Sequence, residues 1–263
     1  MISIDKYAYS SKLKHTDPMQ KLVFALLTLA VCIWADRNII SIAVIFIMGS
    51  MTVLRGGTSF RFFIKLLLVP MFFLLIGVFT IAVNASEKPE LLLAAIPVAG
   101  TWIGFSRMGL QDALQLFLKA SGAVSCLYFL SLSTPMVDLL TVLRRLRLPK
   151  LLIELMGLVY RFIFVLLETA DTMITAQDSR LGYSNLSSAY RSLAALASTL
   201  FIRAYKRSDD LYTALEARGY DGELNVLEES FETHWTKYIP PVTVNLFLIL
   251  SALFLKSYTE GIL

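Results

Sequence analysis

The sequence is poor in charged residues and in cysteine. Asp, Glu, Lys and Arg make up 17% of its 263 residues where about 25% is usual, whereas apolar residues reach 56%. The mean hydropathy of +0.66 agrees with this bias. Cys32 and Cys126 both lie inside apolar runs, so we interpret them as small buried hydrophobes. The composition excludes a disordered chain and a small disulfide scaffold, and it indicates a protein embedded in a bilayer.

Motifs of common catalytic and nucleic-acid-binding sites are also missing. The two histidines stand near opposite ends of the chain, and there is no His-Glu-x-x-His, Cys-x-x-Cys, phosphate loop or Gly-x-Ser-x-Gly. A basic face with interleaved aromatic residues is absent too, so no nucleic-acid partner is expected. The sequence favours a chain without catalytic residues, cofactor or metal ligands of its own; a membrane enzyme is the weaker alternative.

Long apolar segments are what the sequence does contain. A spanning helix needs about 20 residues, and five segments are candidates: residues 22–35, 39–54, 62–83, 110–132 and 239–255. The first two are short but adjoin, which suits a tight helical hairpin. Residues 91–103 are moderately apolar but short and interrupted, so a surface or re-entrant loop is expected between residues 84 and 107.

The distribution of Lys and Arg predicts the orientation in the membrane. The net charge is only 24 − 20 = +4. With five spans, however, one side receives nineteen basic residues and the other four. Basic residues favour the cytoplasmic side. We therefore expect a multi-pass protein of a bacterial or archaeal cytoplasmic (inner) membrane, with the N-terminus and residues 135–238 in the cytoplasm.

Residues 135–238 are too numerous for a connecting loop. The pattern predicts three helices in them, at about 135–146, 151–174 and 188–218. The expected fold is therefore all-α, with about five transmembrane helices and about three cytoplasmic or interfacial helices. We divide the chain into a membrane domain of four helices (1–134), a cytoplasmic helical domain (135–238) and a last transmembrane helix (239–263).

The segment 151–174 is apolar enough to be mistaken for a sixth span. Glu154, Arg161 and Glu168 recur every seven residues and form one charged stripe along it. Each ionised group at the bilayer centre costs about 2.5–3.5 kcal/mol on insertion scales. An interfacial helix is therefore favoured, with a true span as the alternative.

Two of the predicted cytoplasmic helices end alike. One runs into Ser179-Arg180-Leu181-Gly182-Tyr183 and the other into Ala217-Arg218-Gly219-Tyr220. In each, a glycine stands where a helix would stop and an arginine occupies the final turn, where a cation suits the helix dipole. Such pairs are often simple helix caps. Their repetition in one cytoplasmic block favours two displayed guanidinium groups, each able to bind carboxylates through two hydrogen bonds.

These features resemble the transmembrane T component of energy-coupling factor (ECF) transporters, in particular the cobalt-type branch. The resemblance covers nearly the whole chain and is carried by five segments: residues 4–8, residues 17–22, the run from Tyr160 to Glu168, and the two arginine motifs. In this family two short Ala-Arg-Gly-like motifs contact two ATPase subunits. The resemblance assigns this role to Ser179, Arg180, Leu181, Ala217, Arg218 and Gly219, although Ser179 and Leu181 depart from the family pattern.

The resemblance implies a scaffold that links two ABC-type ATPases to a membrane substrate-binding subunit. In the cobalt-type branch that subunit captures Co²⁺ or Ni²⁺, often with a small accessory membrane subunit, and ATP and Mg²⁺ bind to the ATPases. A vitamin-type T component is one alternative. A self-sufficient carrier is another, because Asp112 and Lys119 in the fourth apolar segment could mark an ion pathway; they could equally face a partner or snorkel.

Overall fold

The structure is a computed structural model that describes residues 3–86, 92–98, 101–220 and 238–260. Over these ranges the chain is predominantly helical, so the predicted all-α, polytopic fold class is confirmed. The part of the predicted cytoplasmic domain between residues 221 and 237 lies outside the described residues. Two compact units are present: one comprises Leu139–Glu229, and the other comprises Ile2–Asp138 together with Ser230–Leu263.

The larger unit holds the apolar helices. They are α1 (Ser3–Ser10), α2 (Pro18–Ala35), α3 (Asn38–Ser50) with its π-helical extension η1 (Met51–Arg55), α4 (Phe60–Ala82), α5 (Arg107–Ser133) and α9 (Ile239–Glu260). Four are long and apolar enough to cross a membrane: α2, α3 with η1, α4 and α5. These four confirm the first four predicted spans to within a few residues. α9 matches the fifth, and its described apolar part, Ile239–Phe254, is shorter.

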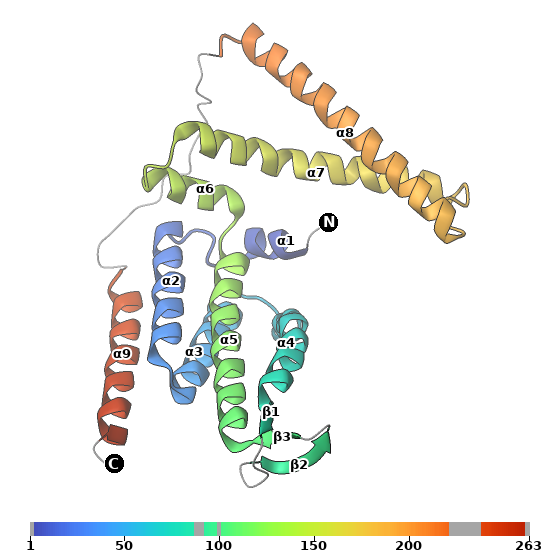
Figure 1. The fold of residues 1–263 in the computed structure, drawn as a ribbon. Helices are drawn as coiled ribbons and strands as arrows, with labels where there is room; N and C mark the ends of the chain where they lie inside the picture. Colours follow the sequence, from blue (N-terminus) through green and yellow to red (C-terminus); the bar gives the residue numbers. More distant parts are fainter. Residues whose placement is uncertain (1–2, 87–91, 99–100, 221–237, 261–263) are drawn as a thin grey trace. The chain divides into compact units, whose positions relative to one another are not determined.

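Helix α5 lies at the centre of this unit, with α2, α3 and α4 packed around it and α9 beside α2 (Figure 1). Small side chains make the contact between α2 and α5 close. A Cβ atom added to Gly122 of α5 would lie 2.7 Å from the Sγ atom of Cys32 in α2. Such close approach through small residues is typical of helices that associate in membranes.

Local chemistry determines where α2 begins and ends. The side chain of Asp17 accepts a hydrogen bond from the Met19 amide at 3.0 Å, and Pro18 follows at the first helical position. At the other end Asp36 adopts the left-handed conformation with φ of 46°. Asp tolerates this conformation better than most residues, and the chain turns directly into α3.

The segment between α4 and α5 corrects the sequence prediction. The expected loop is a three-stranded antiparallel sheet of β1 (Val83–Ser86), β2 (Leu92–Val98) and β3 (Thr101–Ser106), in the order β1-β3-β2. Residues 91, 99 and 100 of the predicted apolar stretch lie outside the described residues. Near a membrane, backbone amides need partners other than water, and pairing of these short strands with one another supplies them.

The smaller unit consists mainly of two long helices, α7 (Lys150–Asp178) and α8 (Leu186–Ala217), which a short turn joins into a hairpin (Figure 1). The chain reaches them through α6 (Met136–Arg145). All three helices occur where the sequence predicts them. Helix α7 is not among the candidate spans of the described residues, and its placement at the membrane surface stays a prediction.

Candidate coupling site

The two arginine motifs have the same backbone geometry at the ends of α7 and α8. After α8, the amide of Tyr220 donates to the carbonyl of Leu215 and that of Gly219 donates to Glu216, both at 3.0 Å. Gly219, which donates the second of these bonds, adopts the left-handed conformation with φ of 74°. These two bonds define a Schellman motif, which satisfies the last carbonyls of a helix. Arg218 therefore lies directly before the residue at which the chain leaves the helix.

At the end of α7 the same motif is built with a different residue. The amide of Gly182 donates to the carbonyl of Gln177 at 2.8 Å, and that of Leu181 donates to Asp178 at 2.9 Å. The left-handed residue is Leu181, with φ of 60°, and not Gly182 as the sequence pattern suggested. Leu181 is thus the structural equivalent of Gly219, and Arg180 is the equivalent of Arg218.

Gly182 is needed for a different reason. A Cβ atom at this position would lie 2.7 Å from the Oγ atom of Ser192 and 2.8 Å from the carbonyl oxygen of Gln177. The turn between α7 and α8 is closed by further bonds in the same place: Gln177 Nε2 donates to the Ser192 carbonyl at 3.0 Å, and Ser192 Oγ donates to the Gly182 carbonyl at 2.9 Å. The tip that carries Arg180 is therefore rigid.

Both arginine side chains are exposed. Within the described part of the chain, neither guanidinium takes part in a hydrogen bond or ion pair. The 32 residues of α8 separate the two arginines, which corresponds to about 48 Å at 1.5 Å per residue. Ser179 and Ala217, which precede the arginines, are also exposed. The hairpin thus presents two separate cationic tips, too far apart to bind one small ligand together.

In the charged stripe of α7, the side chain of one residue is hydrogen-bonded and the other two side chains are exposed to solvent. Glu154 Oε2 accepts a hydrogen bond from the hydroxyl of Tyr220 at 3.2 Å. This bond ties the end of the second arginine motif back to the beginning of α7. The charged groups of Arg161 and Glu168 are exposed and make no hydrogen bond or ion pair with the described residues. The sequence identified the stripe, but nothing in the spacing pointed to the contact with Tyr220.

A buried lysine of α2 that contacts the end of α5 is a functional candidate that the sequence analysis missed. Lys21 is 4% exposed, and its Nζ atom donates to the carbonyls of Ser133 at 2.9 Å and Leu13 at 3.1 Å. Ser133 is the last residue of α5, where backbone carbonyls lack helical partners and a cation is favourable. The lysine therefore fixes α5 just before the chain continues into α6. Its place four residues after Asp17, at the polar start of an apolar run, was the available signal.

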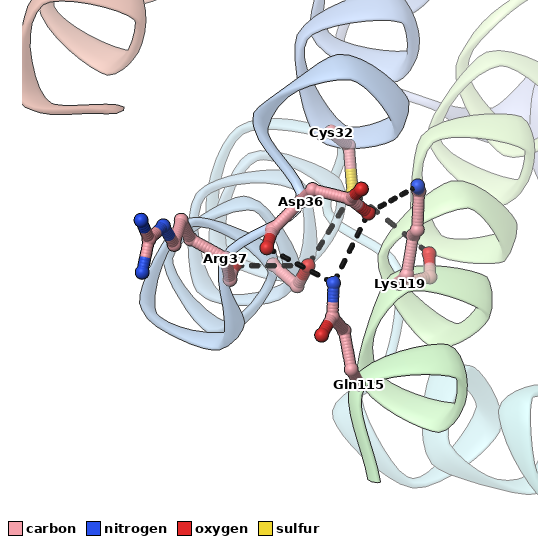
Figure 2. A network of polar contacts seen from close by, with 6 residues as sticks. Cys32, Asp36, Arg37, Gln115 and Lys119 are labelled. Carbon is pink, nitrogen blue, oxygen red and sulfur yellow. Dashed lines mark hydrogen bonds and ion pairs between the residues drawn. The ribbon is translucent and has the colours of Figure 1, made fainter. Parts of the chain in front are cut away.

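Lys119, one of two charged residues in the fourth apolar segment, has an ion-pair partner. Lys119 of α5 forms an ion pair with Asp36 in the turn between α2 and α3, at 2.7 Å between Nζ and Oδ1 (Figure 2). Gln115 donates from Nε2 to the same carboxylate at 3.1 Å and to the Asp36 carbonyl at 3.0 Å. The hydrogen bond from Lys119 holds the pKa of the Asp36 carboxyl below its ordinary value.

This network clarifies the role of Lys119. Because α2 and α3 are shorter than α5, their turn meets α5 at Lys119 and supplies a counter-ion there. The ion pair joins α5 to the turn between α2 and α3. This structural role accounts for Lys119 without an ion pathway. Asp112, the other charge in this segment, is exposed.

Comparisons with known proteins agree with this architecture. The sequence model of the CbiQ family, described as "Cobalt transport protein", matches residues 9–228. The cobalt transport protein CbiQ of Salmonella typhimurium is 34% identical over 226 residues, which are 86% of this chain and 100% of that protein. The energy-coupling factor transporter transmembrane protein EcfT of Staphylococcus aureus is 27% identical over 261 residues, 91% of this chain and 93% of that protein.

A third relative is longer than this chain. The putative fused cobalt transport protein CbiMQ of Methanocorpusculum labreanum is 27% identical over 251 residues, which are 95% of this chain but 41% of that protein. The similarity to the CbiQ and EcfT proteins runs through both units, from the apolar helices to the α7–α8 hairpin. The chain belongs to the CbiQ family of cobalt transport proteins and is a transmembrane component of the energy-coupling factor type.

Proposed function

We propose that this chain is the energy-coupling scaffold of an ATP-driven importer of Co²⁺ or Ni²⁺. In this proposal it links two ABC-type ATPases to a membrane substrate-binding subunit, with or without a small accessory membrane subunit. The observation that carries the proposal is the pair of rigid, exposed arginine tips about 48 Å apart on one hairpin. Two tips of equal geometry suit two equivalent protein partners, each offering an acidic groove.

The chemistry is then divided among subunits. ATP and Mg²⁺ bind to the ATPases, and this chain converts their closing and opening into motion of the substrate-binding subunit without catalysing a reaction itself. The short route from α5 through α6 to the hairpin suits this task, because Lys21 anchors the end of α5, where this route begins. The relative that is fused to a further cobalt transport segment supports a physical association with such a membrane partner.

Cobalt-type transport is favoured over the vitamin-type alternative because the cobalt family model covers residues 9–228 and the CbiQ relative is the more similar of the two kinds. The proposal assigns no metal site to this chain. Calorimetry of the purified subunit with Co²⁺ and Ni²⁺, after removal of any purification tag, should show no stoichiometric binding. Micromolar binding at one site would contradict the division of labour.

The arginine tips are tested by recovery of the ATPases with the tagged chain from membranes. Loss of one partner of a largely desolvated ion pair costs about 2–5 kcal/mol, and 1.4 kcal/mol is tenfold in affinity. Arg180→Ala or Arg218→Ala should therefore weaken recovery at least tenfold, and the double variant should abolish it. Arg203→Ala, an exposed arginine in the middle of α8, is the matched control and should bind normally. Normal recovery of the ATPases with the double variant would mean that both arginines serve only as helix caps.

The proposal also places the N-terminus and residues 135–238 in the cytoplasm of a bacterial or archaeal cell, and the C-terminus outside. It rests on nineteen basic residues against four. Cysteines introduced at Glu87 and Glu229, in a background lacking Cys32 and Cys126, should label differently. An impermeant thiol reagent added to intact cells should reach position 87 only. Labelling of position 229 under these conditions would mean that the predicted number of spans is wrong.

A further inference from the structure

A cavity of about 390 Å³ opens among the helix ends of the larger unit. Its walls come from the start of α2, the end of η1, the end of α5 and the start of α9. If α2, α3 with η1, α4 and α5 cross the membrane in turn, the start of α2, the end of η1, the end of α5 and the start of α9 all lie on the side of the N-terminus. The cavity is therefore at the boundary between headgroups and acyl chains.

One buried hydrogen-bond donor of the cavity lining is unused. Gln20 is 4% exposed and lines the cavity, and its Nε2 atom has no hydrogen-bond partner within the described ranges. A buried amide donor without a partner is unfavourable, so a ligand that accepts its hydrogen bond is favoured. Arg55 and His15, both exposed, also line the cavity, as does Lys21, the residue next to Gln20 in the chain.

Among the residues that the structure describes, no acidic side chain lines the cavity. The carboxylates that act on Lys21 are those of Asp138 and Asp17, and neither lines the cavity. Asp17 is directed to the first turn of α2, where it accepts from the Met19 amide. The donors that face the cavity are therefore not neutralised by an acid within it, and they favour an anionic ligand.

Much of the lining is apolar, and it includes Phe24 of α2, Met51 of η1, Phe129 of α5 and Val244 of α9. A small inorganic anion would leave this apolar surface exposed to water, which is unfavourable. A ligand with an anionic head and a hydrocarbon tail would fill both parts of the cavity. Basic pockets between transmembrane helices are known to hold lipid head groups of this kind.

We propose that this cavity binds the phosphate head group of an anionic phospholipid, with Gln20 Nε2 and Arg55 as hydrogen-bond donors and the Phe24–Phe129 wall against the acyl chain. The proposal is independent of the transport function proposed above, since it uses only the cavity and its position in the membrane. The bound lipid joins α2, α5, η1 and α9 at the surface from which the coupling helices leave.

Native mass spectrometry of the full-length chain, released from detergent after incubation with phosphatidylglycerol or phosphatidylcholine, tests this assignment. The wild type should retain one phosphatidylglycerol in preference to phosphatidylcholine. Loss of a hydrogen bond to a charged group weakens binding by about tenfold or more, so Arg55→Gln should lower retention by about that factor. Gln20→Glu, which is isosteric but repels phosphate, should do the same.

Arg61→Gln is the matched control, because Arg61 is exposed in the first turn of α4 and does not line the cavity. It should leave retention unchanged within twofold. If Gln20→Glu does not fold, the exposed Arg55 decides the question alone. Equal retention by Arg55→Gln and the wild type, or equal binding of both lipids, would overturn the proposal. Protection from thermal unfolding by inorganic phosphate alone, lost in Arg55→Gln, would assign the cavity to a soluble anion and overturn the lipid assignment.

Discussion

Replacement of Lys21 by methionine should be among the most damaging single changes in this chain. Methionine has a similar length and no charge, so it fills the space but removes the two hydrogen bonds from Nζ to the Ser133 and Leu13 carbonyls. Each buried carbonyl left without a partner costs about 1–3 kcal/mol. Breaking a buried ionic contact by removing one member costs about 3–5 kcal/mol, and here the nearby carboxylates of Asp17 and Asp138 lose their cation.

These contributions overlap, so the expected loss is about 3–5 kcal/mol and not their sum. For a chain of this size 1 kcal/mol corresponds to about 2–4 °C in Tm, and Lys21→Met should therefore lower the midpoint of thermal unfolding in detergent by about 10 °C. Lys65→Met, on an exposed lysine of α4, is the control and should change stability by less than about 0.5 kcal/mol. Adding Asp138→Asn to Lys21→Met should recover part of the loss by removing a stranded charge. Equal midpoints for Lys21→Met and Lys65→Met would refute the role of Lys21 as the anchor of α5.

The two arginine tips give predictions of opposite sign. Leu181→Gly relieves a left-handed residue that costs about 1–2 kcal/mol against an entropic penalty for glycine of about 0.5–1 kcal/mol, so thermal unfolding should show a gain of about 0.5–1 kcal/mol. Gly219→Ala places a Cβ atom in the same conformation and should cost about 1 kcal/mol in the same assay; a stabilised Gly219→Ala would contradict the Schellman geometry. Tyr220→Phe removes the hydrogen bond to Glu154, worth about 0.5–1.5 kcal/mol, and should increase hydrogen exchange at the end of α8 while the ATPases are still recovered. Unchanged exchange there would show that this bond does not hold the hairpin.

Sequence patterns predicted the helices well because hydrophobic length and helix-stop chemistry are local. The first span was expected at residues 22–35 and is observed at Pro18–Ala35, and the arginines of both motifs were placed at helix ends where the structure has them. The sequence did not show that the left-handed residue would be Leu181 and not Gly182. A left-handed leucine contradicts local propensity, and it is fixed by the contact between Gly182 and Ser192, which are ten residues apart.

Contacts between distant segments explain the remaining differences. Lys21 bonds to Ser133 and Lys119 pairs with Asp36, at separations of 112 and 83 residues. Neither spacing has a periodic signal. The sheet of β1, β2 and β3 was missed because its strands are four to seven residues long, and because Pro97 and Gly104 lie inside two of them. Such short apolar runs do not distinguish a strand from a loop until their partners are known.

The most direct test of energy coupling is ATP-driven accumulation of ⁵⁷Co²⁺ in proteoliposomes that contain the complete transporter, with this chain carrying Arg180→Ala and Arg218→Ala together. The subunit amounts are matched by quantitative blotting, and Arg203→Ala is assayed in parallel. The account predicts that the double variant accumulates cobalt only at the rate measured without ATP, whereas Arg203→Ala transports at the wild-type rate. Transport by the double variant at the wild-type rate would contradict the claim that the two arginine tips transmit the work of the ATPases.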